Sequence, residues 1–207
     1  AGLALARRAC VPVVGVFHTD FPAYVDRLFD DEALTRVTAV AMSMIYRRFA
    51  CVLTRSADYG RRLVDLGVEP ARLETLRTGL DLSGFNPRFR DPSIWTALGV
   101  PASTVKFLYV GRVSLEKNLP FLVSVWKSLN ARGSLVVVGD GPYREAMERE
   151  LAGTGAHFLG FRHGAELSAL YASSDAFVFP SITDTLGQVV LEAQASGLPV
   201  IVSDRGG

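Results

Sequence analysis

The chain has 207 residues, 49% of them apolar and 21% charged, which is typical of a globular protein with a hydrophobic core. Its formal net charge of +1 does not favour nucleic acid as the main partner. Cys10 and Cys51 lie far apart in the sequence and form no metal-binding or redox pair, so we expect two buried thiols.

Apolar runs rich in β-branched residues predict buried strands in the first half, with helices between them. The chain opens inside an apolar helical stretch and stops directly after a strand, so we expect a fragment of a longer protein. Ser56 is placed to cap a helix that ends at Gly67. The predicted strands are 11–19, 50–54 and 72–78, and a further helix covers 33–49.

Strands and helices alternate more regularly in the second half, after a stretch from Gly79 to Ser103 that is rich in turn-forming residues and includes a short helix around 93–98. This alternation is typical of parallel sheets that are covered on both faces. The predicted strands are 105–110, 134–139, 156–160, 175–180 and 198–203, and the predicted helices are 119–131, opened by Asn118, 143–151, 166–173 and 187–196.

The segment GRVSLEKN (111–118) follows the first strand of the second half. Ligands of parallel α/β sheets bind beyond the carboxyl ends of the strands, and a helix N-terminus there offers free N–H groups. Together with Arg112 and Lys117, Gly111 and the helix start at Asn118 suit a diphosphate. The alternative is a solvated Arg and Lys on a surface loop, which the position in the fold makes the weaker interpretation.

The turn GDGP (139–142) also follows a strand. Glycines allow a close approach of backbone to a ligand, but a tight turn explains Gly139 and Gly141 equally well. The two interpretations stay open. The turn does not match a dinucleotide or P-loop fingerprint.

The stretch 180–200 runs from a polar loop into a largely apolar helix. Amides of Leu186, Gly187 and Gln188 would point out of the helix start toward an anion, with Asp184 just before them. Glu192 lies inside the helix, and a buried carboxylate needs partners. Ribose hydroxyl groups would serve, and an ion pair to an internal Arg or Lys is the alternative.

The segment FHTDFPAY (17–24) follows the first strand, which places His18 and Asp20 at a carboxyl edge. A lone histidine there is equally often a packing residue. The basic stretch around 46–49 closes a helix, and its positive charge complements the helix dipole. Binding of an anionic acceptor or a lipid headgroup by this stretch is the less favoured alternative.

These motifs together resemble retaining GT-B glycosyltransferases of family four. Such enzymes carry a GR-x-x-x-x-K segment, a GxGP turn and a Glu-x7-Glu signature, and residues 106–207 match this pattern densely. HTDFPAY and GLDLSGFNP resemble members that act on lipid or phospholipid acceptors, and the first half matches more loosely. The corresponding residues are Gly111, Arg112, Lys117, Gly139, Gly141, Pro142, Asp184 and Glu192.

The resemblance implies an α/β fold with two Rossmann-like parallel-sheet domains, the N-terminal one incomplete. It divides the chain into a partial acceptor-side domain (1–85), a linker (86–103) and a donor-binding domain (104–207) that lacks its final helices. It also implies a cleft that cannot close properly, with weak donor binding and poor turnover. It further implies a cytoplasmic protein, peripheral at the inner membrane face.

The resemblance also assigns roles to residues. Arg112 and Lys117 would hold the donor diphosphate, Glu192 the ribose hydroxyls and Asp184 the hydroxyls of the transferred sugar. The remaining assignments are backbone near Leu186 and Gly187 for the sugar or phosphate, backbone near Phe161 and Arg162 for the base, and His18 for the donor sugar from the other domain.

The resemblance implies neither a metal nor a cofactor, since the nucleotide sugar is a substrate. The family usually has Glu at the position of Asp184, and the shorter side chain reaches less far. The alternatives that remain are a non-catalytic nucleotide-sugar-binding fragment and another GT-B enzyme such as a sugar-nucleotide epimerase. A Rossmann dehydrogenase is the weakest option, because no dinucleotide fingerprint follows the first strand.

Overall fold

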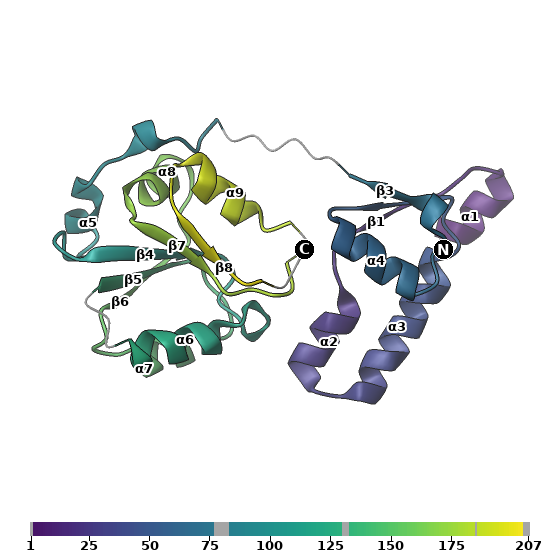
Figure 1. Ribbon diagram of the computed structural model, residues 1–207, viewed down its shortest axis with the longest axis horizontal. Helices are drawn as coiled ribbons and strands as arrows, with labels where there is room; N and C mark the ends of the chain where they lie inside the picture. The colour runs from purple at the N-terminus through teal and green to yellow at the C-terminus, as the bar shows by residue number, and fades with distance from the viewer. Residues whose placement is uncertain (1, 77–82, 130–132, 185, 205–207) are drawn as a thin grey trace. The chain divides into compact units, whose positions relative to one another are not determined.

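The computed structural model describes residues 2–76, 83–129, 133–184 and 186–204. The chain forms two compact units, each built on a parallel sheet (Figure 1). The first unit holds the described residues up to 76 together with Thr183, Asp184 and Leu186, and the second holds those of 83–182 and 187–204. The predicted α/β fold with two parallel sheets is confirmed.

The first unit has a three-stranded sheet in the order β1-β2-β3. Its core consists of Phe17, Met42, Val52, Tyr59, Leu63 and Val68. The strands are β1 (Val14–Phe17), β2 (Cys51–Thr54) and β3 (Leu73–Thr75), and the helices are α1 (Gly2–Ala9), α2 (Phe21–Phe29), α3 (Glu32–Tyr46), α4 (Ala57–Asp65) and the 3₁₀ turn η1 (Pro70–Arg72).

Helix α2 was not predicted, although the sequence carries its start signal. The carboxylate of Asp20 accepts a hydrogen bond from the amide of Ala23 at 3.4 Å, and Pro22 lies in the first turn. The same carboxylate also pairs with Arg62 of α4. Asp20 is buried, and these partners explain it without a ligand.

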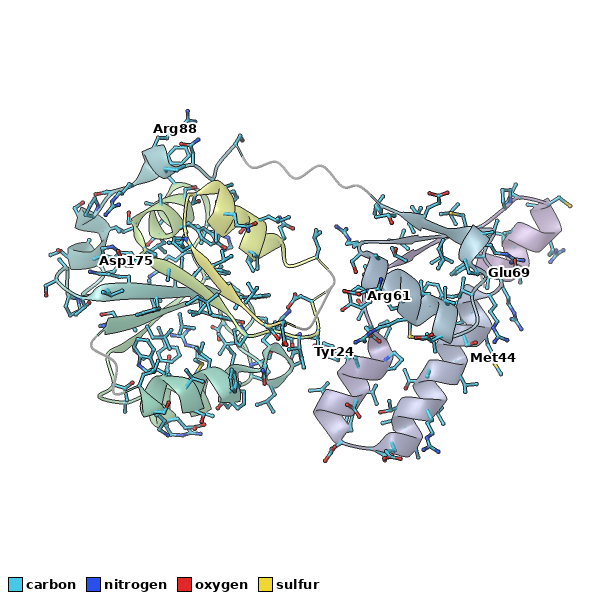
Figure 2. The ribbon with its side chains drawn as sticks, viewed as in Figure 1. Tyr24, Met44, Arg61, Glu69, Arg88 and Asp175 are labelled. Atoms are coloured by element: carbon cyan, nitrogen blue, oxygen red, sulfur yellow. The ribbon has the colours of Figure 1, made fainter. Side chains whose placement is uncertain are left out.

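The prediction that 11–19 is a buried strand is wrong for one face. Gly15 and Phe17 are buried, whereas Val14 is 55% and Val16 39% exposed. Apolar side chains are exposed on α3 as well, among them Met44 (Figure 2). The expectation of two buried thiols is also wrong, because Cys10 is exposed and Cys51 half-buried.

The second unit has a five-stranded parallel sheet in the order β6-β5-β4-β7-β8. Helices α6 and α7 lie on one face of the sheet and α8 and α9 on the other (Figure 1). The strands are β4 (Val105–Val110), β5 (Gly133–Val138), β6 (Ala156–Gly160), β7 (Ala176–Phe179) and β8 (Val200–Val202). The helices are η2 (Pro87–Phe89), α5 (Ser93–Ala97), η3 (Leu115–Lys117), α6 (Leu119–Ser128), α7 (Arg144–Glu150), α8 (Gly164–Ser173) and α9 (Gln188–Ala195).

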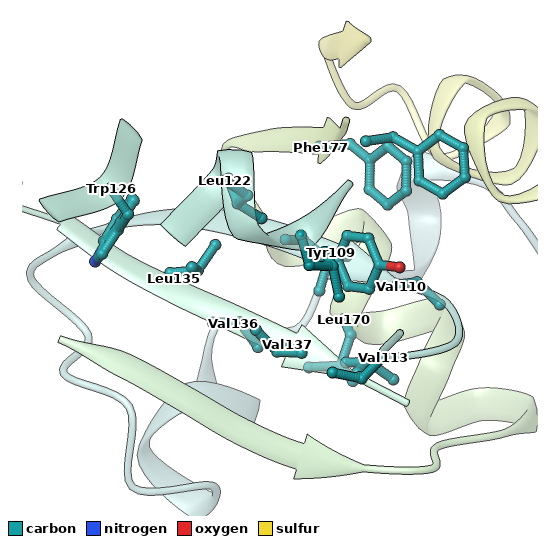
Figure 3. Close-up of a cluster of buried hydrophobic side chains, with 14 of the residues drawn as sticks. Tyr109, Val110, Val113, Leu122, Trp126, Leu135, Val136, Val137, Leu170 and Phe177 are labelled. Atoms are coloured by element: carbon teal, nitrogen blue, oxygen red, sulfur yellow. The ribbon is translucent and has the colours of Figure 1, made fainter. Parts of the chain in front are cut away.

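The core of this unit is larger than that of the first and centres on β5, which is buried at every position. Leu135, Val136 and Val137 of β5 pack in one cluster with Tyr109 of β4 and Phe177 of β7 (Figure 3). Since helices cover both faces of the sheet, the strands read as continuous apolar runs.

The stretch predicted as a linker (86–103) packs on the second unit. Trp95 of α5 is buried and its indole donates to the carbonyl of Ser173 at 3.1 Å. The amide of Asp91 donates to the hydroxyl of Ser173 at 2.8 Å. These bonds to α8 attach the stretch to the second unit. Within the described residues, no helix is both long and apolar enough to span a bilayer.

Candidate active site

The sheet of the second unit has a topological switch point between β4 and β7. From β4 the chain proceeds to β5 and β6 on one side, and then returns to β7 and β8 on the other. The loops that follow β4 and β7 therefore leave the sheet in opposite directions and border a crevice, which is where open α/β sheets bind ligands. The predicted ligand-binding segment 111–118 is the loop after β4, and residues 180–182 of the stretch 180–200 begin the loop after β7.

Hydrogen bonds fix the path of the loop after β4. The hydroxyl of Tyr109 donates to the carbonyl of Arg112 at 2.9 Å. The amide of Gly111 donates to the carbonyl of Val138 at 3.0 Å, and the amide of Val113 to that of Asp140 at 2.9 Å. The main chain of Arg112 is thereby held in place, while Arg112 as a whole is exposed to solvent.

Lys117 ends the turn η3, and Asn118 joins this turn to α6. Asn118 has a left-handed backbone, with φ of 57°, and its side chain makes no capping hydrogen bond to α6. The side-chain amide of Asn118 instead donates to the carbonyl of Pro180 at 3.2 Å, in the loop that follows β7. Asn118 therefore opens the helix as predicted, and it also joins the two loops that border the switch point.

The glycines of GDGP allow one loop backbone to approach another. A Cβ on Gly139 would lie 2.0 Å from the carbonyl oxygen of Gly111, and a Cβ on Gly141 would lie 2.3 Å from that of Val113. Real Cβ atoms do not come so close to backbone, so any side chain here would force the loops apart. This packing explains both glycines without a ligand, and ligand contact by them remains a prediction.

Glu192 lies in α9, the helix that Gly187 opens with φ of 60°. It is 9% exposed, and its carboxylate accepts two hydrogen bonds. One comes from the Tyr171 hydroxyl at 3.0 Å and the other from the side-chain amide of Gln188 at 3.2 Å. Within the described residues no ion pair to Arg or Lys explains Glu192. Its partners are neutral donors, so the internal ion pair that we considered is not found there.

Burial raises the pKa of Glu192, while the hydrogen bonds from Tyr171 and Gln188 lower it and offset only part of the rise. The pKa of Tyr171 is raised too, first by burial and then by the neighbouring carboxylate. Tyr171 therefore keeps its proton and always presents a donor. Neither donor was predicted, although Gln188 precedes Glu192 by one helical turn and Tyr171 is the one phenol in the stretch 166–173.

Phe161 and Arg162 follow β6, an edge strand of the same sheet. Phe161 is 63% exposed and its ring is stacked on His163, with centroids 6.3 Å apart. The Arg162 side chain lies 2.9 Å from the carboxylate of Glu166 and donates to the carbonyl of Phe161 at 3.1 Å. The side chain of Arg162 is thus occupied by local contacts. The predicted contact of this segment with the base of the nucleotide is therefore left to its main chain.

The remaining predicted residues belong to the first unit. His18 is exposed, and its Nδ1 lies 3.3 Å from the carbonyl oxygen of Val16. Asp184 and Leu186 are half-buried. In the second unit Gly111, Arg112, Lys117, Gly139 and Gly141 lie in loops that follow β4 and β5, Gly187 opens α9 and Glu192 lies inside that helix. The roles of all these residues, and of His18, Asp184 and Leu186, stay predictions. No group of three or more His, Cys, Asp or Glu that could hold a metal ion occurs among the described residues.

Comparison with known proteins places both units in one family. Residues 104–207 match the family described as "Glycosyl transferases group 1", and residues 1–83 match "Glycosyltransferase Family 4". The sulfoquinovosyl transferase SQD2 of Arabidopsis thaliana is 38% identical over 99% of this chain and 40% of that protein. A GDP-mannose-dependent alpha-mannosyltransferase of Mycobacterium tuberculosis is 34% identical over 100% of this chain and 52% of that protein. The chain thus spans about half the length of these relatives or less.

Solved structures share the fold at lower identity. Anabaena Alr3699/HepE, solved in complex with UDP and glucose, superposes with a TM-score of 0.77 at 22% identity, over 100% of this chain and 56% of that one. Sucrose-phosphate synthase from Thermosynechococcus elongatus gives a TM-score of 0.79 at 24% identity, over 100% and 53%. The GT-B fold is therefore shown over the whole chain, and with half of the chain matched by the group 1 family, the chain belongs to the family 4 glycosyltransferases of group 1.

Proposed function

We propose that this chain carries the donor-binding side, and part of the acceptor side, of a retaining glycosyltransferase. The enzyme moves a hexose from a UDP- or GDP-linked donor to a hydroxyl of a lipid or glycan. The observation that carries the proposal is the hydrogen bond from Asn118 to the carbonyl of Pro180, which joins the loops on the two sides of the switch point. Cationic side chains and the start of α9 therefore share one edge of the sheet.

Arg112 and Lys117 are the proposed ligands of the donor pyrophosphate. The main chain of Arg112 is fixed by Tyr109, so the exposed guanidinium is presented from a rigid base. A guanidinium recognises phosphate oxygens with two parallel hydrogen bonds, while an ammonium acts as a point charge. Positive charge at this place also stabilises the negative charge that grows on the leaving nucleoside diphosphate.

Glu192 is the proposed ligand of the ribose. Its two oxygens each accept one hydrogen bond inside the protein, and a carboxylate offers about four acceptor sites. Two sites remain for a pair of vicinal hydroxyls. Asp184, amides near Leu186 and Gly187, backbone near Phe161 and Arg162, and His18 keep the sugar, phosphate and base contacts assigned to them above.

The proposed reaction retains configuration at the transferred carbon. The bond between that carbon and the diphosphate oxygen breaks, and the acceptor oxygen bonds to it from the same face. The proton of the acceptor hydroxyl passes to an oxygen of the leaving diphosphate, so charge and atoms balance. The protein contributes position and positive charge.

A lipid acceptor is supported by the relatives. One of them, 33% identical over 62% of this chain, is named a phosphatidylinositol dimannoside mannosyltransferase. We also propose that the protein is cytoplasmic and peripheral at the inner face of the membrane, where it would meet a lipid acceptor.

Nucleotide titration followed by thermal denaturation tests the proposal. We expect UDP or GDP, and the matching nucleotide sugar, to raise the Tm of the chain. Arg112→Ala and Lys117→Ala should each weaken affinity about tenfold to a hundredfold, because each removes a hydrogen bond to a charged group. Lys127→Ala is the matched control, since Lys127 lies on α6 with its side chain 49% exposed.

The outcomes separate the candidate functions. If neither UDP nor GDP raises the Tm, the site assignment is wrong. Nucleotide binding without sugar transfer to a lipid or glycan would support a non-catalytic fragment instead. Conversion of the donor sugar in the absence of any acceptor would support an epimerase.

A further inference from the structure

Tyr171 lies at the centre of the second unit and is fully buried. Its ring packs edge-on against Phe85, with centroids 5.5 Å apart, and tilted against Phe177 at 5.7 Å. Phe177 is itself buried in β7. Aromatic neighbours from two segments, the stretch before η2 and β7, therefore fix the ring, and the core of the second unit sets the place of its hydroxyl.

The hydroxyl of Tyr171 donates to one oxygen of Glu192 at 3.0 Å. The other oxygen accepts from Gln188 at 3.2 Å, but Gln188 is exposed and its flexible side chain is free to turn to solvent. A glutamate has three rotatable side-chain bonds, and one firm donor is needed to hold its carboxylate in a single orientation.

We propose that Tyr171 is a positioning residue for nucleotide-sugar binding, whose hydroxyl holds the Glu192 carboxylate in the orientation that accepts the ribose hydroxyls. The inference rests on the proposed function, because it takes Glu192 as the ribose ligand. Tyr171 itself touches no part of the donor. Its effect reaches the ligand through one hydrogen bond to a charged group, which is among the stronger kinds of hydrogen bond.

The test compares Tyr171→Phe with Tyr143→Phe. Tyr143 is the matched control, because its hydroxyl also donates to a glutamate, Glu150, at 2.8 Å, on the exposed surface of α7. The probes are UDP and 2′,3′-dideoxy-UDP, or the guanine pair if GDP is the nucleotide that binds. We expect Tyr171→Phe to weaken UDP binding about tenfold and dideoxy-UDP binding less than twofold, and Tyr143→Phe to change neither.

A double-mutant cycle with Glu192→Gln gives a readout that a general packing defect would not move. If the hydroxyl acts through the carboxylate, Tyr171→Phe should have no further effect on affinity once Glu192 is replaced. If Tyr171→Phe alone unfolds at the assay temperature, adding Glu192→Gln should restore the fold. The second substitution removes the buried carboxylate that has lost its hydrogen bond from the Tyr171 hydroxyl. A double variant that stays unfolded overturns the inference.

Failure of this inference can be told apart from failure of the proposed function. Equal losses for UDP and dideoxy-UDP, or a Tyr171→Phe variant that binds like Tyr143→Phe, overturn the role of Tyr171 while Lys117→Ala still weakens binding. Absence of any nucleotide binding by the wild-type chain overturns both.

Discussion

The two units use the same alternation of strands and helices, but an inner strand of the second unit and an edge strand of the first are buried differently. β5 of the second unit is buried at all its positions, whereas β1 of the first is buried at alternate positions only. Both segments are apolar runs, and the sequence analysis treated them alike. The difference teaches that an apolar run permits burial on both faces, while helices packed on each face decide whether it occurs. Only the second unit has helices on both faces of its sheet in the described part of the chain.

Glycine-to-alanine substitutions should show the largest difference in stability change between the two units. Gly139→Ala should destabilise the second unit by about 3 kcal/mol or more, because its Cβ would overlap the carbonyl of Gly111. Gly60→Ala in α4 of the first unit should stabilise by about 0.5–1 kcal/mol, since its Cβ would meet nothing closer than 3.9 Å. Both tryptophans, Trp95 and Trp126, lie in the second unit, so their fluorescence reports its unfolding. A Gly139→Ala variant with unchanged stability would contradict the close approach of the two loops.

A smaller difference is expected at valines. Val136 in β5 is fully buried and Val16 in β1 is 39% exposed. Val136→Ala should cost about 2 kcal/mol, from two lost methyl groups and the cavity they leave. Val16→Ala should stay within about 0.5 kcal/mol. Urea unfolding followed by tryptophan fluorescence and by circular dichroism measures both, and equal costs would mean that β1 is covered on both faces.

The smallest effect concerns the charge of Glu192. Burial raises its pKa above 4.5, so the stability it contributes is complete below pH 4.5 and is lost as pH rises through the raised pKa, when the folded state must hold a buried charge. Donor binding should change in the opposite direction, because the ribose needs the ionised acceptor. We expect Glu192→Gln to abolish both dependences, with a Tm at pH 7 that is equal to or above that of the wild type.

Measurements of Tm and of nucleotide-sugar affinity from pH 5 to 8 check this prediction. The nucleotide sugar is used rather than UDP, because a terminal phosphate titrates near pH ~6 and would mask the effect. Glu32→Gln on α3 is the control in the first unit, since the side chain of Glu32 is 87% exposed. A donor affinity that is independent of pH in the wild type would argue against Glu192 as the ribose ligand.

Most strands could be predicted because parallel strands have a strong local signal. The structure reproduces 105–110 and 156–160 as predicted, and the other strands to within a few residues. Helix α2 was missed because Asp20 was interpreted as a residue at the carboxyl end of the first strand, and not as the cap of a helix with Pro22 in its first turn. The stretch 86–103 was assigned to a linker because it is rich in turn-forming residues. Its short helix was predicted and is confirmed, but the bond from Trp95 to Ser173, 78 residues away, has no local signal.

The candidate site could be predicted less completely than the fold. Loops at strand ends follow from the order of elements, and so Arg112, Lys117 and Glu192 could be chosen from the sequence. Of the two partners of Glu192, Tyr171 could not be predicted, because it comes from another helix and nothing local marks the contact. Gln188 precedes Glu192 by one helical turn, so its spacing could have indicated the contact. Asn118 was correctly predicted at the start of a helix. Its hydrogen bond to Pro180 was not predicted, because helix-start propensity gives no information on distant partners.

The close passage of Gly139 beside Gly111 has a consequence for protein engineering. Each of the two loops shapes the route of the other, so inserting or deleting residues in one would require a matching redesign of its neighbour. Directed evolution toward new sugar donors should therefore advance by exchanging exposed side chains at constant loop length, and libraries that vary loop length after β4 or β5 should yield mostly misfolded clones.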